Sequence, residues 1–244
     1  EIELVNYFIK GNIELTKVDA DYPDNKLTGA VFEVYADTNG NGEFDKDDEL
    51  CGEMTELEGG VYQMTELRYG KYFVREKTAP DGFVLDESVY GVSIEENGKT
   101  YTVENKAGVG FINDAQKGSL KIVKTSSDGK VEGFSFRVTS ADGYDQTFKT
   151  DKNGEIFIEG LRIGEYTVSE VSDSASAGYI LPADKQATVK TDSTTIVEMH
   201  NEFRDTPKTG DDFNLGLWVS LAAASVIGAG VLGFVGFKKK KKED

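Results

Sequence analysis

Apolar and polar residues alternate along most of the chain before residue 213. The runs are rich in Val, Ile, Phe, Tyr and Leu, and Ile13, Leu15, Tyr166 and Val168 occupy every second position of two of them. Clusters of Gly, Asn and Asp interrupt the runs, and no segment there has a helical period. This pattern predicts short β-strands that bury one face. We expect an all-β fold made of small antiparallel β-sandwiches.

The strand pattern occurs twice, which predicts two tandem domains. We place them at 11–116 and 117–204. Residues 1–8 alternate like the end of each repeat, so we expect them to be the last strand of a further domain upstream of Glu1. Three pairs of segments carry the repeat: 11–17 (GNIELTK) with 118–124 (GSLKIVK), 72–76 (YFVRE) with 166–170 (YTVSE), and 109–113 (VGFIN) with 197–201 (VEMHN).

Each repeat directs three polar side chains toward the apolar face of its strands. They are Lys17, Glu76 and Asn113 in the first repeat, and Lys124, Glu170 and Asn201 in the second. Isolated charges inside a protein are strongly unfavourable, so these groups must compensate one another. One interpretation is a buried Lys–Glu salt bridge with a hydrogen-bonded Asn. The other is a covalent bond between the lysine and the asparagine.

The covalent hypothesis follows from what burial does to these groups. Burial lowers the pKa of a lysine and raises that of a glutamate, so both become neutral. A neutral amine is a nucleophile, and a protonated carboxyl can polarise the asparagine amide and carry protons as ammonia leaves. Glu76 and Glu170 would then each catalyse a single autocatalytic turnover. The products are two isopeptide bonds, Lys17–Asn113 and Lys124–Asn201, formed without any required cofactor.

This arrangement resembles the Cna-B (prealbumin-like, SpaA-like) domain of Gram-positive adhesins and pilins. Residues 76–83 (EKTAPDGF) are also similar to the pilin E-box, with Lys77 in its second place. The second repeat lacks the Ala-Pro-x-Gly run, so its resemblance depends on Lys124, Glu170 and Asn201. The resemblance covers residues 11–203 and implies a structural surface protein rather than an enzyme.

Charge and rare residues exclude several other classes. The chain has 27 basic and 44 acidic side chains, a net charge of −17, which disfavours nucleic acid as a partner. One cysteine and one histidine exclude an internal disulfide and most zinc sites. The stability of an exported protein with this composition must therefore have another source.

The last part of the chain predicts covalent attachment to a cell wall. Residues 213–237 carry no charge and are long enough for a transmembrane helix, and the basic segment 238–244 follows as a cytoplasmic tail. The linker 205–212 contains Thr206, Pro207, Lys208, Thr209 and Gly210, which resemble a sortase sorting signal with Thr in place of the usual Leu. An ordinary membrane anchor is the alternative.

The resemblance to a sorting signal implies the partners and the location. Sortase would cut between Thr209 and Gly210 and pass the Thr209 carbonyl to an amine of the peptidoglycan cross-bridge or to a pilin lysine. The membrane would then hold only the precursor. The Thr at position 206 leaves the sortase class open.

An acidic loop in the first repeat has the ligand spacing of a Ca²⁺ site. Oxygen-bearing side chains recur with EF-hand periodicity, and Gly42 is at the sixth position. A solvated acidic hairpin is the alternative. The candidate ligands are Asp37, Asn39, Asn41, Glu43, Asp45 and Asp48.

These observations favour a wall-anchored surface stalk or adhesin fragment with self-formed isopeptide bonds. Two alternatives stay open: a pilin subunit polymerised by sortase, and a spacer in a larger surface enzyme or adhesin whose active domain lies upstream. A host or extracellular ligand is a further expected partner.

Overall fold

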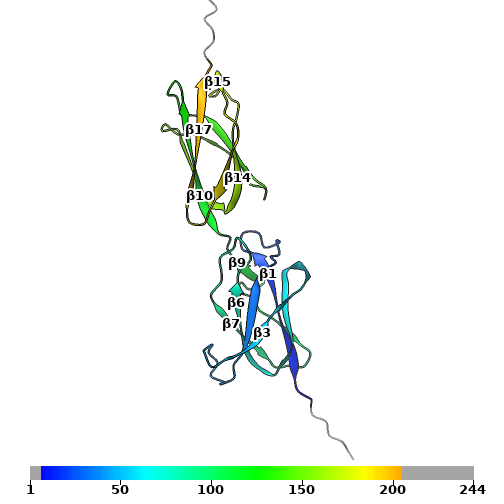
Figure 1. Ribbon diagram of the computed structural model, residues 1–244. Helices are drawn as coiled ribbons and strands as arrows, with labels where there is room; N and C mark the ends of the chain where they lie inside the picture. The colour runs from blue at the N-terminus through cyan, green and yellow to red at the C-terminus, as the bar shows by residue number, and fades with distance from the viewer. Residues whose placement is uncertain (1–6, 205–244) are drawn as a thin grey trace, which may run out of the picture. The chain divides into compact units, whose positions relative to one another are not determined.

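The computed structural model describes residues 7–204, which form two β-sandwiches with separate apolar cores (Figure 1). Seventeen strands make up these sandwiches, and the helical segment among the described residues is one short 3-10 turn, η1 (Glu58–Gly60). The all-β class predicted from the alternating pattern is confirmed. Each sandwich is described below by itself.

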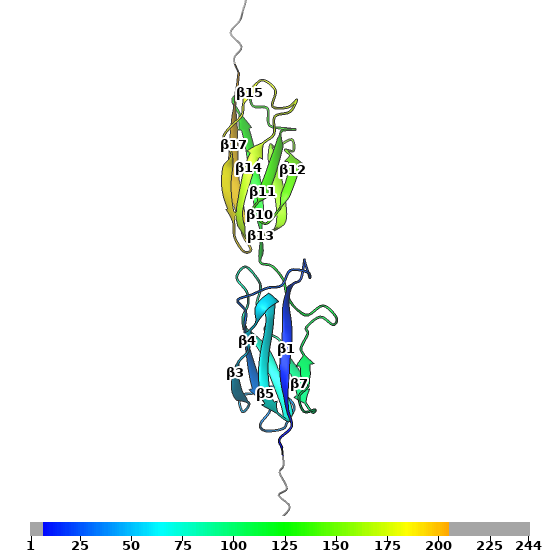
Figure 2. The ribbon, with the colours of Figure 1, turned by 90° about the vertical axis from the view of Figure 1, so that its right-hand side faces the viewer.

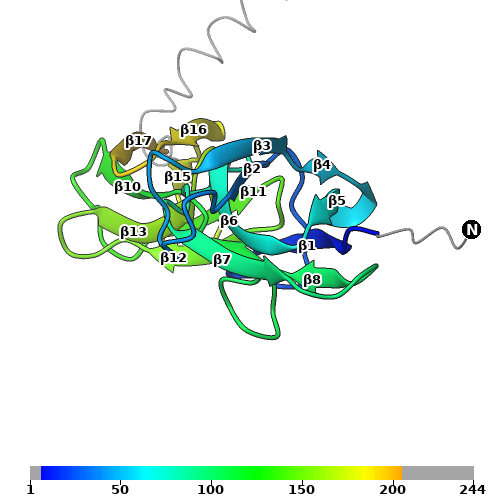
Figure 3. The same ribbon diagram turned by 90° about the horizontal axis from the view of Figure 1, so that it is seen from below.

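The first sandwich packs two sheets around one core. One sheet has the order β4-β5-β1-β8, with β9 also paired to β1, and the other has the order β3-β2-β6-β7. Figure 3 shows β5 and β8 flanking β1. The strands are β1 (Lys10–Asp19), β2 (Val31–Ala36), β3 (Glu49–Glu53), β4 (Thr55–Glu56), β5 (Val61–Arg68), β6 (Gly70–Thr78), β7 (Val89–Ile94), β8 (Thr100–Thr102) and β9 (Phe111–Asn113).

The second sandwich repeats this plan. Its sheets have the orders β13-β10-β17-β15 and β12-β11-β14-β16, and β10 lies beside β17 in both Figure 1 and Figure 2. The strands are β10 (Lys117–Ser126), β11 (Ser135–Ser140), β12 (Asp145–Lys149), β13 (Glu155–Arg162), β14 (Gly164–Glu170), β15 (Tyr179–Ile180), β16 (Lys185–Val189) and β17 (Thr194–Phe203).

Alternation along the strands fills both cores. Every second residue of β1 is buried, including Ile13 and Leu15, and β10 buries Leu120 and Ile122 in the same way. Burying a side chain of this size stabilises a fold by about 1.5–3 kcal/mol. The apolar positions thus determine which face of each strand meets the opposite sheet.

The sheets are not purely antiparallel, which corrects the predicted architecture. The first strand of each sandwich runs parallel to the last, β1 with β9 and β10 with β17. Parallel neighbours need a long connection, and here nearly the whole domain forms it. The two ends of each domain are therefore carried by adjacent strands.

Several predicted segments lie outside the described residues: the linker 205–212, the helix 213–237 and the tail 238–244. Of the predicted strand 1–8, only Tyr7 and Phe8 are described; both are exposed and belong to no strand. Within residues 7–204 no helix has the length and apolar character that a membrane crossing requires.

Candidate functional site

The strand register brings lysine, glutamate and asparagine together inside the first sandwich. Lys17 of β1 is opposite Phe111 of β9, so Asn113, two residues further along β9, lies diagonally across on the same face. Glu76 is on β6 of the facing sheet, opposite Phe32 of β2. Side chains at such diagonal positions are within reach of a long lysine.

The second sandwich has the same register. Lys124 of β10 is opposite Met199, which places Asn201 diagonally across on β17. Glu170 of β14 is opposite Phe136, just as Glu76 is opposite Phe32. Two stretches of different sequence therefore present the same three groups from equivalent strands.

All six groups point inward as predicted, and five of the six residues are buried. The exposed fraction of Lys17 is 0%, and those of Lys124 and Asn201 are 1% and 0%. Glu76 and Asn113 are each 3% exposed. Glu170 is only partly buried, because it is the last residue of β14 and the chain leaves the sheet there.

In the first sandwich Glu76 lies between the amine and the amide. Lys17 Nζ is 3.5 Å from Glu76 Oε1 and donates a hydrogen bond to the Phe111 carbonyl at 3.2 Å. Asn113 Nδ2 donates to Glu76 Oε2 at 2.7 Å and to the Val84 carbonyl at 2.6 Å. These two bonds orient the amide so that its nitrogen, the group that must leave in an amide transfer, faces the carboxyl.

Unpartnered oxygens mark this site as unusual. Asn113 Oδ1 is buried without a hydrogen-bond partner, and Glu76 Oε1 has only the Lys17 ammonium near it, at 3.5 Å. Leaving a buried polar atom unpaired is unfavourable by about 1–3 kcal/mol, and such atoms are rare in structural cores. The buried and unpaired amide oxygen makes the cluster a candidate for a role beyond stability.

Burial makes the Lys17 amine easier to deprotonate. Removal from water lowers the pKa of Lys17 to about 8, although the Glu76 charge opposes the shift. The ammonium is also 4.9 Å from the centre of the Phe111 ring. A fraction of the Lys17 side chains is thus neutral and nucleophilic near neutral pH.

The second site is only partly assembled. Asn201 Nδ2 donates to Glu170 Oε1 at 2.7 Å, but Lys124 Nζ donates to the Thr125 carbonyl and not to the glutamate. Burial lowers the pKa of Lys124 and raises that of Glu170, so both groups move toward their neutral forms. The structure brings Glu170 and Asn201 together, and it leaves the Lys124 ammonium over the Phe134 ring, 4.3 Å from the ring centre.

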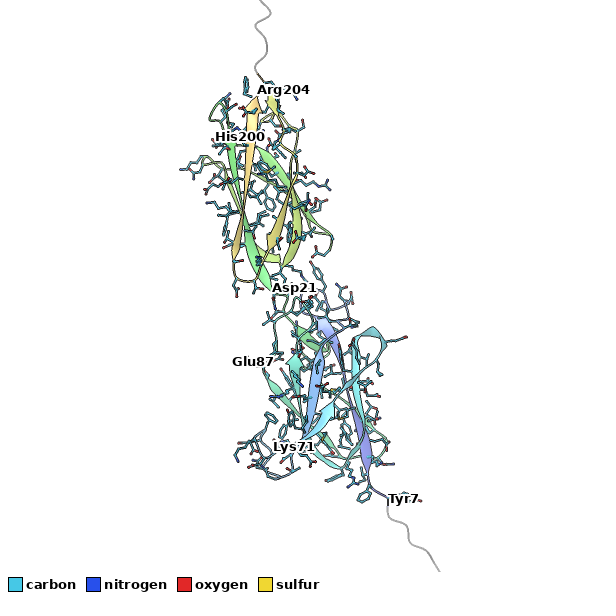
Figure 4. All side chains as sticks on the ribbon, in the orientation of Figure 1. Tyr7, Asp21, Lys71, Glu87, His200 and Arg204 are labelled. Carbon is cyan, nitrogen blue, oxygen red and sulfur yellow. The ribbon has the colours of Figure 1, made fainter. Side chains whose placement is uncertain are left out.

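The acidic loop between β2 and β3 is tightly folded. Asp37 accepts hydrogen bonds from the backbone of Gly40 and Gly42, at 2.7 and 2.9 Å. Phe44 packs edge-on against Tyr35 of β2, and the Lys71 ammonium, on β6, donates to the Gly42 carbonyl at 2.6 Å. Lys71 is labelled in Figure 4 beside this loop. The loop is therefore attached to the outer face of its sheet.

The same loop fits a Ca²⁺ ion only in part. Within residues 7–204 no group of three or more His, Cys, Asp or Glu side chains has metal-binding geometry. Asn39 and Asn41 direct their amide nitrogens toward Asp45, at 3.1 and 2.7 Å. A cation there would require both amides to turn their oxygens inward, together with the unpartnered Oδ1 of Asp48. The Ca²⁺ site stays a prediction.

Two further groups near the first site were not predicted from the sequence. The backbone of Asp86 donates to Glu76 Oε2 at 2.9 Å, and Asn105 contacts both Asp86 and β9. Neither residue shares the strand alternation that identified the three central groups, because both lie in connecting segments. His200, labelled in Figure 4, is exposed as expected from its position between inward-facing neighbours.

Comparison with known proteins agrees with this fold. A model of the SpaA prealbumin-like fold domain matches residues 11–107 and again residues 118–203. These two matches cover most of the chain. The chain therefore belongs to the SpaA prealbumin-like domain family and carries two of its domains in tandem. None of the curated proteins matches it.

Solved structures of Gram-positive proteins are also similar. The Bacillus anthracis TIE protein has a TM-score of 0.60 and 25% identity over 80% of this chain, which spans 34% of the length of that structure. GBS52, a minor pilin of Streptococcus agalactiae, has a TM-score of 0.38 and 16% identity over 82% of this chain and 99% of its own. A C-terminal fragment of the pilus adhesin SpaC from Lactobacillus rhamnosus GG has a TM-score of 0.49 and 13% identity, over 82% of this chain and 99% of that fragment.

Proposed function

We propose that this chain is a cell-surface stalk whose two domains are each closed by a self-formed isopeptide bond. Lys17 joins Asn113 and Lys124 joins Asn201, with Glu76 and Glu170 as the catalytic residues. The observation that carries the proposal is the position of the buried Glu76 carboxyl, 3.5 Å from the Lys17 amine and 2.7 Å from the Asn113 amide nitrogen.

The bond forms by transfer of the Asn113 acyl group. The neutral Lys17 amine attacks Asn113 Cγ, a C–N bond forms to Nζ, and the bond from Cγ to Nδ2 breaks. The proton that the amine loses reaches Nδ2 through the Glu76 carboxyl, and Nδ2 leaves as ammonia. No oxidant or external cofactor takes part. The fold contributes to the rate by holding the amine and the amide against the same carboxyl, so that no bimolecular encounter is needed.

The parallel first and last strands give this bond a mechanical role. In each sandwich the chain enters on the strand that carries the lysine and leaves on the strand that carries the asparagine. A force that pulls on the two ends would pass through the covalent link instead of separating the strands. This property suits a stalk that is exposed to shear and has one cysteine.

The sorting-signal resemblance at Thr206, Pro207, Lys208, Thr209 and Gly210 supports anchoring by sortase to peptidoglycan or to a pilin lysine. Membership of the SpaA prealbumin-like domain family supports a surface location. Cell-wall extracts would separate two versions of the function. Covalent ladders of high molecular mass indicate a pilin subunit, and a single anchored species indicates a stalk or the spacer of a larger surface protein.

The intact mass of residues 7–204, which contain both complete cores, tests the isopeptide proposal. Two bonds make this chain lighter than calculated by two molecules of ammonia. The double variant Glu76→Ala, Glu170→Ala should have the full calculated mass, and the control variant Glu53→Ala, Glu159→Ala, at exposed positions, should still lose two ammonia molecules. A wild-type chain of full mass would refute the proposal.

A further inference from the structure

The last strand of the first sandwich is short and is held on one side by a side chain. Within residues 7–204, β9 contains three residues and pairs only with β1. Asn105 reaches its other edge: Asn105 Oδ1 accepts a hydrogen bond from the Ile112 backbone at 2.6 Å, and Nδ2 donates to the Ile112 carbonyl at 2.8 Å. The amide of Asn105 thus occupies the place that a neighbouring strand would take.

The Asn105 amide is also linked to Glu76, through hydrogen bonds that Asp86 makes with both residues. Asn105 Nδ2 also donates to Asp86 Oδ2 at 2.9 Å, and the Tyr90 hydroxyl donates to that oxygen at 2.6 Å. The Asp86 backbone N–H in turn donates to Glu76 Oε2 at 2.9 Å. Burial opposes ionisation of Asp86, but the bonds from Tyr90 and Asn105 outweigh it and lower its pKa to about 2. Asp86 is therefore a charged acceptor at neutral pH.

These contacts close a ring of hydrogen bonds around the reacting groups. The ring runs from Glu76 through Asp86 and Asn105 to Ile112, and returns from the next residue, Asn113, to Glu76. Asn113 follows Ile112 directly, so a displacement of β9 moves its carboxamide by the same amount. Misplacement of a reacting group by about 1 Å can slow a reaction by about a hundredfold.

We propose that Asn105 is the positioning residue for the bond between Lys17 and Asn113. By bridging Asp86 and the Ile112 backbone it holds the Asn113 carboxamide against Glu76. The inference deepens the proposed isopeptide function and rests on it. Asn105 does not touch the reacting atoms and acts through Ile112 and Asp86.

The second sandwich supplies an internal control. Its last strand, β17, has ten residues and pairs with β10 at eight positions from Ser119 to Ser126. The backbone hydrogen bonds between β17 and β10 hold this strand in place, and Asn201 Nδ2 lies 2.7 Å from Glu170 Oε1. The bond between Lys124 and Asn201 therefore has no need of Asn105, and both bonds can be followed in one molecule.

The test compares the rates of the two bonds in the full chain. Wild-type and Asn105→Ala chains are kept in urea from synthesis onward and diluted into buffer, and samples are stopped in acid at intervals. Proteolysis and mass spectrometry then measure the branched peptide of each domain. Asn105→Ala should slow formation of the Lys17–Asn113 bond by about tenfold or more and leave the rate of the Lys124–Asn201 bond unchanged. Asn153→Ala, in an exposed turn of the second domain, should change neither rate.

A second variant covers the case in which the alanine chain does not fold. Asn105→Asp keeps the side-chain shape and the bond from the Ile112 N–H but loses both donated bonds, and it should also slow the first bond selectively. Folding is measured separately by urea unfolding of each variant combined with Glu76→Gln, so that rates are compared between folded molecules.

Equal rates of the first bond in wild type and in a folded Asn105 variant would overturn the inference, as would equal slowing of both bonds. If wild type forms neither bond, the proposed function itself fails.

Discussion

Lys17 places a primary amine inside an apolar sandwich, and its protonation decides whether it can react. Burial lowers the pKa of Lys17 to about 8, so about a tenth of these amines are neutral at pH 7. An ordinary lysine, with a pKa of about 10.4, would have far fewer neutral molecules at that pH. The buried environment of Lys17 thus provides the neutral amine that the proposed bond would require.

The rate of the first bond should therefore rise with pH and level off above about pH 8, where most Lys17 amines are neutral. Chains diluted from urea into buffers of different pH, and stopped in acid, give this profile by mass spectrometry. A rate that is independent of pH between about 6 and 9 would contradict the role of the free amine.

The same lowered pKa predicts how stability varies when no bond can form. In an Asn113→Ala chain the folded state releases its Lys17 proton near pH 8, whereas the unfolded state keeps it to about pH 10.4. Between these values the unfolded state binds more protons, so the free energy of unfolding should increase with pH. Urea unfolding at pH 7 and pH 9, below the range in which ordinary tyrosines ionise, measures the difference.

At the scale of single elements, much of the site follows from strand alternation. The period of two correctly directs Lys17, Asn113 and Lys124 inward, because each strand has one face in a core. The parallel pairing of first and last strands was not predictable in this way, since alternation is the same in both directions. Asn105 and Asp86 were also missed, because side chains in connecting segments follow no period.

Both domains have a β-bulge that needs a residue in the left-handed conformation, and they place different residue types there. An extra residue interrupts the pairing of β5 with β1 and of β13 with β10. The left-handed position in β13 is Gly160, with φ +70°, but in β5 it is Glu66, with φ 62°. A left-handed conformation is unfavourable for a residue with a Cβ by about 1–2 kcal/mol.

Glu66→Gly should accordingly stabilise the first sandwich by about 1 kcal/mol. The exposed pair that Glu66 forms with Lys10 contributes little, so its loss should not offset the gain. The reciprocal change Gly160→Glu should destabilise the second sandwich by a similar amount. Thermal unfolding of both variants gives the two values, and a loss of stability in Glu66→Gly would contradict this explanation of the bulge.

The acidic loop predicts a measurable response to Ca²⁺. If the oxygens of Asn39 and Asn41 turn toward Asp45, equilibrium dialysis of residues 7–204 should detect one bound ion, and Asp37→Ala or Asp45→Ala should remove it. The exposed Asp24→Ala serves as the control. Absence of binding by the wild-type chain would assign the loop to structure alone, held by Phe44 and Lys71.

At the scale of the whole molecule, each proposed bond would close a loop that contains most of a domain. In the chain-entropy model a link that closes about 100 residues stabilises a fold by about 4–5 kcal/mol. Glu76→Gln, which keeps the side-chain shape, should therefore lower the unfolding midpoint of the first sandwich by about 20 °C. Glu53→Gln, on the exposed face of β3, should change it little. Calorimetry of the two variants tests this, and equal midpoints would exclude a stabilising link.

The most direct measurement is the identification of the joined peptides. Proteolysis of the purified chain, followed by fragment-ion sequencing, should yield one branched peptide that joins Lys17 to Asn113 and another that joins Lys124 to Asn201, each lacking one ammonia. Linear peptides that contain free Lys17 and intact Asn113 in the folded wild-type protein would contradict the account.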